Sequence, residues 1–304
     1  MPPPEEARPR TLALSFATVG LTLRGHDGPA FRGHAGLSRL GPEYAPFLQP
    51  APLPGLALRM GTAPPSGPRA GAGSRRLFRG TWDLFRERES DLYLDYGPFH
   101  AERRPVLSAR LSGGTGEIDY DLAAGEVFKE PLPYPLNQIL LLHALGLRRG
   151  VLLHGCGLAL GRGADPRGVL CIGPSGAGKS TLASLFDASA VLNDDRVVAV
   201  EDGRGEVLLG GTPWNGDLPH RRGDAVPLGG ILFLEKAPRT RILPMARSEA
   251  LARLTVALLA PYWDPKRLDR HLDFLLALLH RFPCAILESV PGPAVPLEVS
   301  KWLA

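Results

Sequence analysis

A glycine-rich segment in the second half of the chain carries the residue types best suited to chemistry. Residues 173–181 read GPSGAGKST and fit the pattern GxxxxGK[ST], between an apolar stretch and an amphipathic one. Such glycines let successive backbone N–H groups turn toward one anion, and a following helix adds the positive end of its dipole. We expect Lys179 to reach the β- and γ-phosphates of a nucleotide and the Ser180 hydroxyl to bind Mg²⁺. The predicted nucleotide-binding residues are Gly173, Pro174, Ser175, Gly176, Ala177, Gly178, Lys179, Ser180 and Thr181.

Two adjacent carboxylates, Asp194 and Asp195, follow the next apolar run, which begins at Val191. Phosphates bound with Mg²⁺ need a carboxylate nearby, and the end of an apolar strand commonly supplies it. Neighbouring side chains on an extended backbone point in different directions. One of the two acids can therefore bind Mg²⁺ while the other accepts a proton from an attacking hydroxyl. The alternative is a solvated acidic turn that closes a strand.

His154 lies inside the apolar segment 151–160, ahead of the glycine-rich loop. A lone histidine in such a segment is usually a hydrogen-bonded core residue. Its place one strand before the phosphate loop makes it a candidate site residue as well.

Together these segments resemble a known family. HGCGLALG, GVLCIGPSGAGKST and LNDDRV follow one another with similar order and spacing in the C-terminal kinase domain of HPr kinase/phosphorylase, and the resemblance covers residues 151–198. It implies the phosphoenolpyruvate carboxykinase-like P-loop fold. It also implies that Lys179 stabilises the transferring phosphoryl group and that Ser180 and Asp195 lie at Mg²⁺. Asp194 would accept the proton of a serine hydroxyl, and His154 would support the catalytic carboxylate.

The chain departs from this family in several places. The turn GRGADPRG lengthens the link before the loop, and Pro174 and Ala177 replace residues that are usual there. The family's later segment that engages HPr is not found. The chain is therefore more similar to the divergent HPr-kinase-related proteins, some of which phosphorylate a peptide or free serine.

The leading functional interpretation is a kinase that uses ATP and Mg²⁺ to phosphorylate a serine-type hydroxyl of a protein, peptide or small molecule. One alternative is a nucleotide-binding regulatory protein with little or no kinase activity. The other is a small-metabolite kinase, although such chains usually place the phosphate loop near the N-terminus. No guanine-reading NKxD motif is found, so ATP is the expected nucleotide.

The elements that position these residues are expected to form an α/β, mixed α+β, domain over residues 135–304. Apolar strand-like segments there alternate with amphipathic helices, one of which has Asp264 as a plausible N-cap and Pro265 behind it. Before this domain we expect a disordered tail at residues 1–10 and a mostly β domain over residues 11–134. Residues 50–76 are rich in Pro and Gly and predict a loop that continues neither a helix nor a central strand.

Two further segments gave weaker signals. The stretch GGTPWNGD at residues 210–217 could line the nucleotide or substrate pocket, or form a tight loop around a buried Trp214. Four arginines near the next strand could clamp phosphates, but most arginines in so arginine-rich a chain are expected at the solvated surface. These are Arg221, Arg222, Arg239 and Arg241.

Composition narrows the class of protein. The formal charge is +4 and the pI about 9.1, but the arginines are interspersed with acids and there is no basic stripe, so nucleic acid is not an expected partner. No apolar run reaches the roughly 20 residues of a membrane span, and no signal peptide is recognised, so we expect a cytoplasmic protein. Cys156, Cys171 and Cys284 show no CxxC spacing and fit a reduced compartment without a metal site. The oligomeric state, a homo-oligomer included, stays open.

Overall fold

The computed structural model describes residues 8–27, 37, 40–62, 74–80, 82–88, 91–96, 105–121, 131–161 and 165–304. Contacts divide the chain into two units, the first made of Met1–Leu14, Gly20–Tyr44 and Gln49–Leu147. The second is made of Ser15–Val19, Ala45–Leu48 and Arg148–Ala304. This division differs from the expected one after residue 134. Helix α1 (Leu136–Gly146) belongs to the first unit, and two short N-terminal segments belong to the second.

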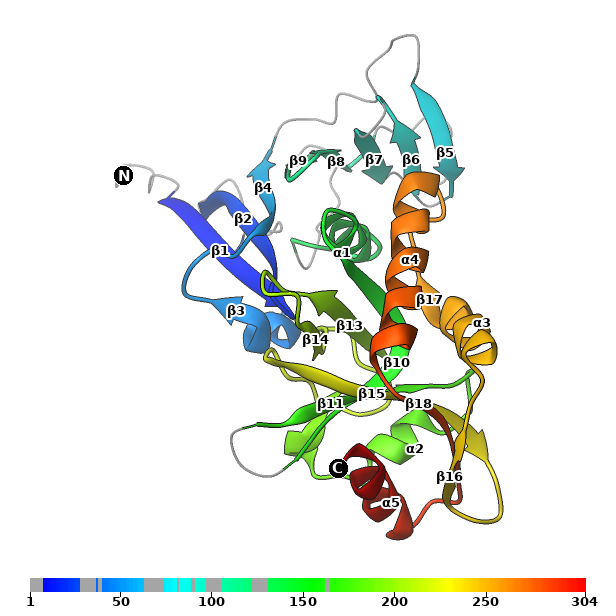
Figure 1. Ribbon diagram of the computed structural model, residues 1–304. Coiled ribbons are helices and arrows are strands. Elements are labelled where there is room, and N and C mark those ends of the chain that lie inside the picture. The colour runs from blue at the N-terminus through cyan, green and yellow to red at the C-terminus, as the bar shows by residue number, and fades with distance from the viewer. Residues whose placement is uncertain are drawn as a thin grey trace. The chain divides into compact units, whose positions relative to one another are not determined.

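Most of the first unit is a sheet of nine strands in the order β3-β1-β2-β4-β9-β8-β7-β6-β5 (Figure 1). Short segments with aromatic and aliphatic residues form β7, β8 and β9, as their composition predicts. These three strands pair antiparallel with their neighbours β6, β7 and β8. The strands are β1 (Arg8–Phe16), β2 (Val19–Asp27), β3 (Leu48–Gln49), β4 (Gly55–Gly61), β5 (Arg75–Arg79), β6 (Trp82–Arg86), β7 (Leu92–Tyr96), β8 (Leu107–Ser112) and β9 (Thr115–Tyr120).

Strand β4 lies inside the segment that was expected to form a loop. Its buried residues Leu56, Leu58 and Met60 alternate with more exposed ones, which is the period of a strand. It pairs in parallel with β2 on one side and β9 on the other. The prediction for this stretch is therefore wrong, because the prolines that suggested a loop lie outside the strand, where they leave its hydrogen bonds intact. Residues 63–73 of that segment lie outside the described residues, as do residues 1–7, and β1 already begins at Arg8.

The second unit is built on strands in the order β11-β10-β13-β14-β15-β18-β16, with β12 and β17 also paired to β10. Strand β11 pairs with β15 as well, so the path from β11 through β10, β13, β14 and β15 closes on itself. The long strand β10 pairs with both β11 and β13, and the long strand β15 pairs with both β14 and β18. The strands are β10 (Gly150–Leu160), β11 (Arg167–Ile172), β12 (Val191–Asn193), β13 (Arg196–Glu201), β14 (Val207–Gly210), β15 (Ala225–Lys236), β16 (Arg241–Pro244), β17 (Leu258–Leu259) and β18 (Cys284–Ser289).

Alternation along the strands creates two hydrophobic cores in this unit. In β11, Leu170 and Ile172 pack with residues of helices α3 (Arg247–Ala257) and α4 (Pro265–Arg281). Val169 and Cys171 point the other way and pack with α2 (Lys179–Ala183) and α5 (Ala294–Leu303). The unit is thus a mixed α+β layer structure, with helices on both faces of its sheet.

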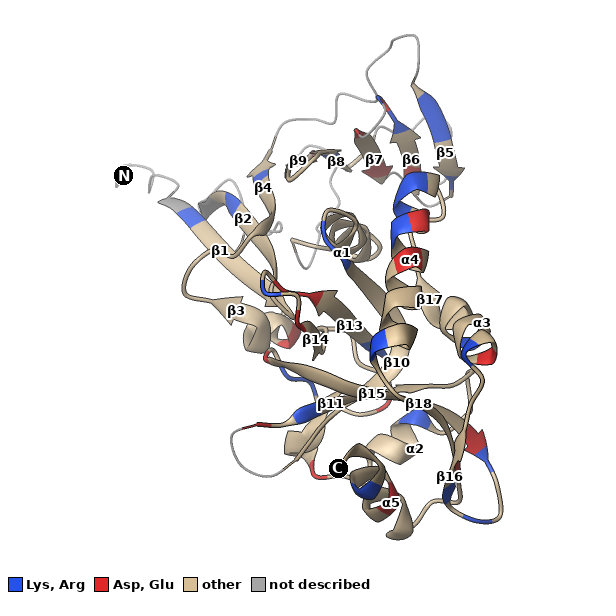
Figure 2. Cartoon of the chain, in the orientation of Figure 1, with Lys and Arg blue, Asp and Glu red and all other residues tan. Residues whose placement is uncertain are grey.

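Helix α4 begins as its sequence predicts. The Asp264 carboxylate accepts a hydrogen bond from the Arg267 N–H at 3.3 Å, and Pro265 occupies the first turn. Figure 2 shows basic and acidic positions interspersed along α3 and α4 rather than separated into faces of one sign. Within the described ranges, no helix has both the length and the apolar character that crossing a bilayer requires.

The turn between β1 and β2 belongs to the second unit. Ala17 and Thr18 have φ values of 48° and 76°, the positive values that a two-residue hairpin turn with the twist of its strands requires. The Ala17 side chain lies against Gly210, where an added Cβ would come within 2.8 Å of the Ala17 Cβ. Next to the turn, the Phe16 ring stacks on Trp214 with 6.5 Å between ring centroids.

Candidate functional site

The glycine-rich loop links β11 to α2, in the strand–loop–helix order that the motif predicts. Gly176 and Gly178 have φ values of 77° and 98°, a region that residues with a side chain rarely occupy. Gly178 is also the N-cap residue of α2, so the loop turns into the helix at the residue before Lys179. The sequence therefore specifies this turn by placing glycine at the two positions, 176 and 178, that require a positive φ.

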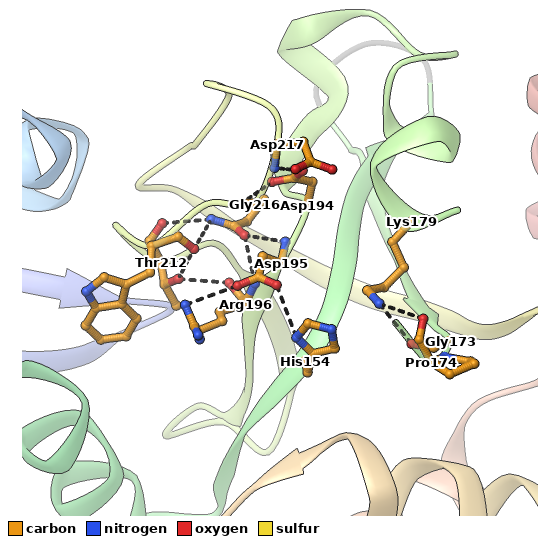
Figure 3. Close-up of polar contacts among 12 residues, drawn as sticks. His154, Gly173, Pro174, Lys179, Asp194, Asp195, Arg196, Thr212, Gly216 and Asp217 are labelled. Carbon is orange, nitrogen blue, oxygen red and sulfur yellow. Dashed lines mark hydrogen bonds and ion pairs between the residues drawn. The ribbon is translucent and has the colours of Figure 1, made fainter. Parts of the chain in front are cut away.

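Lys179 is buried, and its ammonium points back into the loop (Figure 3). Its Nζ donates to the carbonyl oxygens of Gly173 at 2.9 Å and Pro174 at 3.1 Å. Burial lowers the pKa of Lys179, whereas the carboxylates of Asp195 and Asp194 act to raise it. The two carbonyl oxygens thus hold the ammonium group at the centre of the loop, and a phosphate oxygen could replace them as the hydrogen-bond acceptor.

The two acids lie where β12 ends and β13 begins, and both of these strands pair with β10. Asn193 fixes this break in the strand. Its buried amide donates to the carbonyls of Thr212 at 2.9 Å and Trp214 at 3.1 Å, and its Oδ1 accepts from the N–H groups of Asp195 and Arg196, both at 2.8 Å. The side chain therefore ties the acidic turn to the segment 210–217.

Asp194 is 1% exposed, and three backbone N–H groups hold its carboxylate. Its Oδ1 accepts from the Gly216 N–H at 2.8 Å, and its Oδ2 accepts from the N–H groups of Asp217 at 3.0 Å and Leu218 at 3.1 Å. A carboxylate offers about four acceptor positions, so three of them are occupied here. The orientation of this carboxylate is consequently fixed.

Asp195 makes a different set of contacts. Its Oδ1 lies 3.1 Å from Nδ1 of His154, and its Oδ2 lies 3.1 Å from a terminal nitrogen of Arg196. The backbone holds the pair together, because the Gly155 N–H donates to the Asp195 carbonyl at 2.9 Å. Burial and the Lys179 ammonium lower the pKa of His154, against the opposing effect of Asp195, so the ring is neutral near about pH 7.

One cavity of about 720 Å³ brings these groups together. Its walls also include the ends of β15 and β18, at Lys236 and Ser289. Gly173 and Pro174 are the two predicted residues that do not line it, and they reach it only through their carbonyl contacts with Lys179. The predicted residues that line it are His154, Ser175, Gly176, Ala177, Gly178, Lys179, Ser180, Thr181, Asp194 and Asp195.

The segment 210–217 contributes to the site in two ways. Gly216 and Asp217 line the cavity, while Trp214 is half-buried and stacks on Phe16. The segment thus borders the cavity, Trp214 is half-buried rather than buried, and its role at a nucleotide or substrate stays a prediction. Asn193 was not predicted to belong to the site, although an amide that follows an apolar run and directly precedes two acids could have marked a residue that fixes a turn.

The four arginines that could have clamped phosphates do not line this cavity. Arg222 pairs with Asp224 and donates to the Ser189 carbonyl, and Arg241 pairs with Glu288. In the part of the chain that the structure describes, no group of three or more His, Cys, Asp or Glu side chains converges on a metal position.

Neither the protein-family models nor the curated proteins contain a match to this chain.

Proposed function

We propose that this protein is an ATP- and Mg²⁺-dependent kinase that phosphorylates a serine-type hydroxyl of a protein, peptide or small molecule. We further propose that its second unit has the phosphoenolpyruvate carboxykinase-like P-loop fold. The observation that carries the proposal is the single cavity bordered by the glycine-rich loop, Lys179, two adjacent carboxylates and His154. Phosphoryl transfer relies on positioning and charge stabilisation more than on covalent chemistry by the protein, and these groups supply both.

The loop and its flanking residues fit a nucleotide bound with Mg²⁺. Backbone N–H groups of the loop and the Lys179 ammonium would hold the β- and γ-phosphates. The Ser180 hydroxyl and an Asp carboxylate are hard oxygen donors that border the same cavity. Mg²⁺ usually takes one or two protein carboxylates together with substrate phosphates, so a site without three clustered protein ligands suits it. When bound, Mg²⁺ neutralises charge on the phosphates.

The contacts of the two acids favour an exchange of the roles that the family resemblance implies. That resemblance makes Asp194 the proton acceptor, supported by His154, whereas the His154 ring contacts Asp195 instead. Asp194 is fixed by three backbone donors and has about one acceptor position left, which suits a cation. We therefore assign proton acceptance to the Asp195–His154 pair and the metal side of the site to Asp194 with Ser180.

The reaction balances with these groups. A bond forms between the acceptor oxygen and the γ-phosphorus while the bond from that phosphorus to the β–γ bridging oxygen breaks. ADP leaves with the bridging oxygen, and the hydroxyl proton passes to the Asp195–His154 pair. Lys179 stabilises the charge on the transferring group.

The test measures ATP binding and phosphoryl transfer separately. Wild-type protein, Lys179→Met and Asp195→Asn are assayed by calorimetry with ATP and Mg²⁺, and by transfer from radiolabelled ATP to serine-bearing acceptors. Lys301→Met is the matched control, because Lys301 lies at the surface and pairs with Glu298. We expect Asp195→Asn to bind ATP within about threefold of wild type and to transfer at least about 100-fold more slowly.

Lys179→Met should weaken both ATP binding and transfer, and Lys301→Met neither. Tight ATP binding without transfer to any acceptor would refute the kinase proposal and favour a nucleotide-binding regulator. Transfer to small metabolites but to no peptide or protein would favour a small-metabolite kinase.

A further inference from the structure

A second cavity, of about 740 Å³, lies beside the phosphate cavity in the same unit. Its walls come from the ends of β11 and β15, the last turn of α3 and β17. They are mainly aliphatic and aromatic: Ile172, Phe233, Leu234, Val256, Leu258 and Leu259. A cavity of this size and character is typical of a site for an organic group rather than for an ion.

The two cavities meet at the proposed catalytic groups. His154, Ser175 and Leu234 line both of them, and Gly173 and Pro174 of the loop line the second cavity. The His154 ring, whose Nδ1 lies against Asp195, therefore separates a polar space from an apolar one. A group held in the second cavity would therefore lie next to His154 and Ser175, which also border the proposed phosphate site.

Helix α3 turns an apolar face toward this second cavity. Its residues Ala250, Leu254 and Ala257 are buried in the core. Ala252 and Val256 lie on the opposite side, line the cavity and are exposed, with Val256 86% exposed. The apolar lining thus continues onto accessible helix surface, which an incoming group can cover.

The charges at the edge of the second cavity discriminate against an acidic occupant. Arg253 contacts the Glu235 carboxylate at 2.5 Å and the Glu249 carboxylate at 2.6 Å. Its positive charge is therefore already matched, and the three groups together carry one net negative charge. Arg253 is the one lysine or arginine among the described lining residues, so the lining offers no unpaired guanidinium or ammonium group to an acidic occupant.

We propose that the second cavity is the acceptor subsite and selects hydroxyl groups that stand next to an aliphatic or aromatic side chain. This inference rests on the kinase activity proposed above and names the acceptor class for it. Free serine would leave the cavity largely empty, and a serine between acidic residues would meet the negative edge. Burying one large apolar side chain corresponds to about a 10- to 100-fold gain in kcat/KM over a glycine-flanked serine.

The test uses three capped peptides, Ala-Leu-Ser-Leu-Ala, Ala-Gly-Ser-Gly-Ala and Ala-Asp-Ser-Asp-Ala, with wild-type protein, Val256→Glu and Thr255→Glu. Both substituted residues are exposed neighbours on α3, but Thr255 does not line the cavity. Wild type should phosphorylate the leucine peptide at least about tenfold more efficiently than the other two. Val256→Glu should raise the KM for the leucine peptide about tenfold or more and leave the KM for ATP within about twofold. Thr255→Glu should change neither KM.

Equilibrium binding of the leucine peptide, measured by calorimetry, separates failure of this inference from failure of the proposed function. Binding that Val256→Glu abolishes and Thr255→Glu preserves supports the subsite even if no transfer occurs, in which case only the kinase proposal falls. Transfer with equal efficiency for the three peptides, or an equal effect of the two variants, overturns the subsite and leaves the kinase proposal intact. Absence of both peptide binding and transfer to the three peptides overturns the subsite, and the kinase proposal falls with it only if the wider set of serine-bearing acceptors also receives no phosphate.

Discussion

Asn193 is the residue on which the geometry of the two acids depends most, and its removal gives a sharp test. Asn193→Ala leaves four backbone groups without this partner: the carbonyls of Thr212 and Trp214 and the N–H groups of Asp195 and Arg196. The Trp214 carbonyl keeps a hydrogen bond from the Thr212 hydroxyl at 3.3 Å, so three groups remain unpaired.

The expected cost follows from these three groups. An unpaired buried polar group costs about 1–3 kcal/mol, and the lower value applies here because most of these bonds are only partly buried and water can reach them. The free energy of unfolding should therefore fall by about 3 kcal/mol. The proposed binding of ATP should weaken as well, because the turn that carries Asp194 and Asp195 loses its link to the segment 210–217.

The assay is urea denaturation followed by circular dichroism, with Asn215→Ala as the control. Asn215 is half-buried and donates to the carbonyl of Leu218 within its own turn, so its removal should cost about 1 kcal/mol or less. A loss for Asn193→Ala no larger than that for Asn215→Ala would refute the reasoning, because the amide would then contribute nothing beyond a local turn contact.

Three further outcomes follow from other described residues. Burial lowers the pKa of His271 to about 4, so between about pH 6.5 and pH 4 the unfolded chain binds more protons. Stability should fall by about 3 kcal/mol as the pH drops through this window, and pH titration of His271→Leu should show a flatter profile. Gly178→Ala should cost about 1–2 kcal/mol in urea denaturation because of its positive φ, whereas Gly203→Ala, which meets nothing within 4 Å, should cost under about 1 kcal/mol. Burial raises the pKa of Cys171 to about 12 and that of Cys156 well above its usual range, so a thiol reagent at about pH 8 should label both only after unfolding.

The glycine-rich loop was predictable because its physics is local. Strand, loop and helix follow within a few residues, and glycine marks the positions that need positive φ. The placement of His154 beside the acids was predictable only in part. The acid that contacts His154 is set by the break between β12 and β13 and by the register of both strands with β10. The sequence spacing of the two acids predicts neither the break nor the register.

Strand β4 and the division of the chain were harder to predict for the same reason. Leu56, Leu58 and Met60 alternate with more exposed residues, as in a strand. The pattern is short, however, and the flanking prolines and glycines favoured the prediction of a loop. The assignment of Ser15–Val19 to the second unit depends on contacts with residues about 200 positions later in the chain, such as Trp214. Sequence periodicity carries no information about such distant pairs.

The turn at Ala17 and Thr18 ties a short N-terminal segment to the candidate site, so truncating the gene or recombining its two halves would affect that site. Phe16 stacks on Trp214, and the segment that contains Trp214 also supplies the N–H groups that fix Asp194. A gene fragment that encodes only residues 135–304 would omit this support, even though it encodes every residue of the candidate site. Recombination that exchanged the N-terminal half for an unrelated domain would therefore preserve the side chains of the candidate site and still loosen the backbone that orients Asp194.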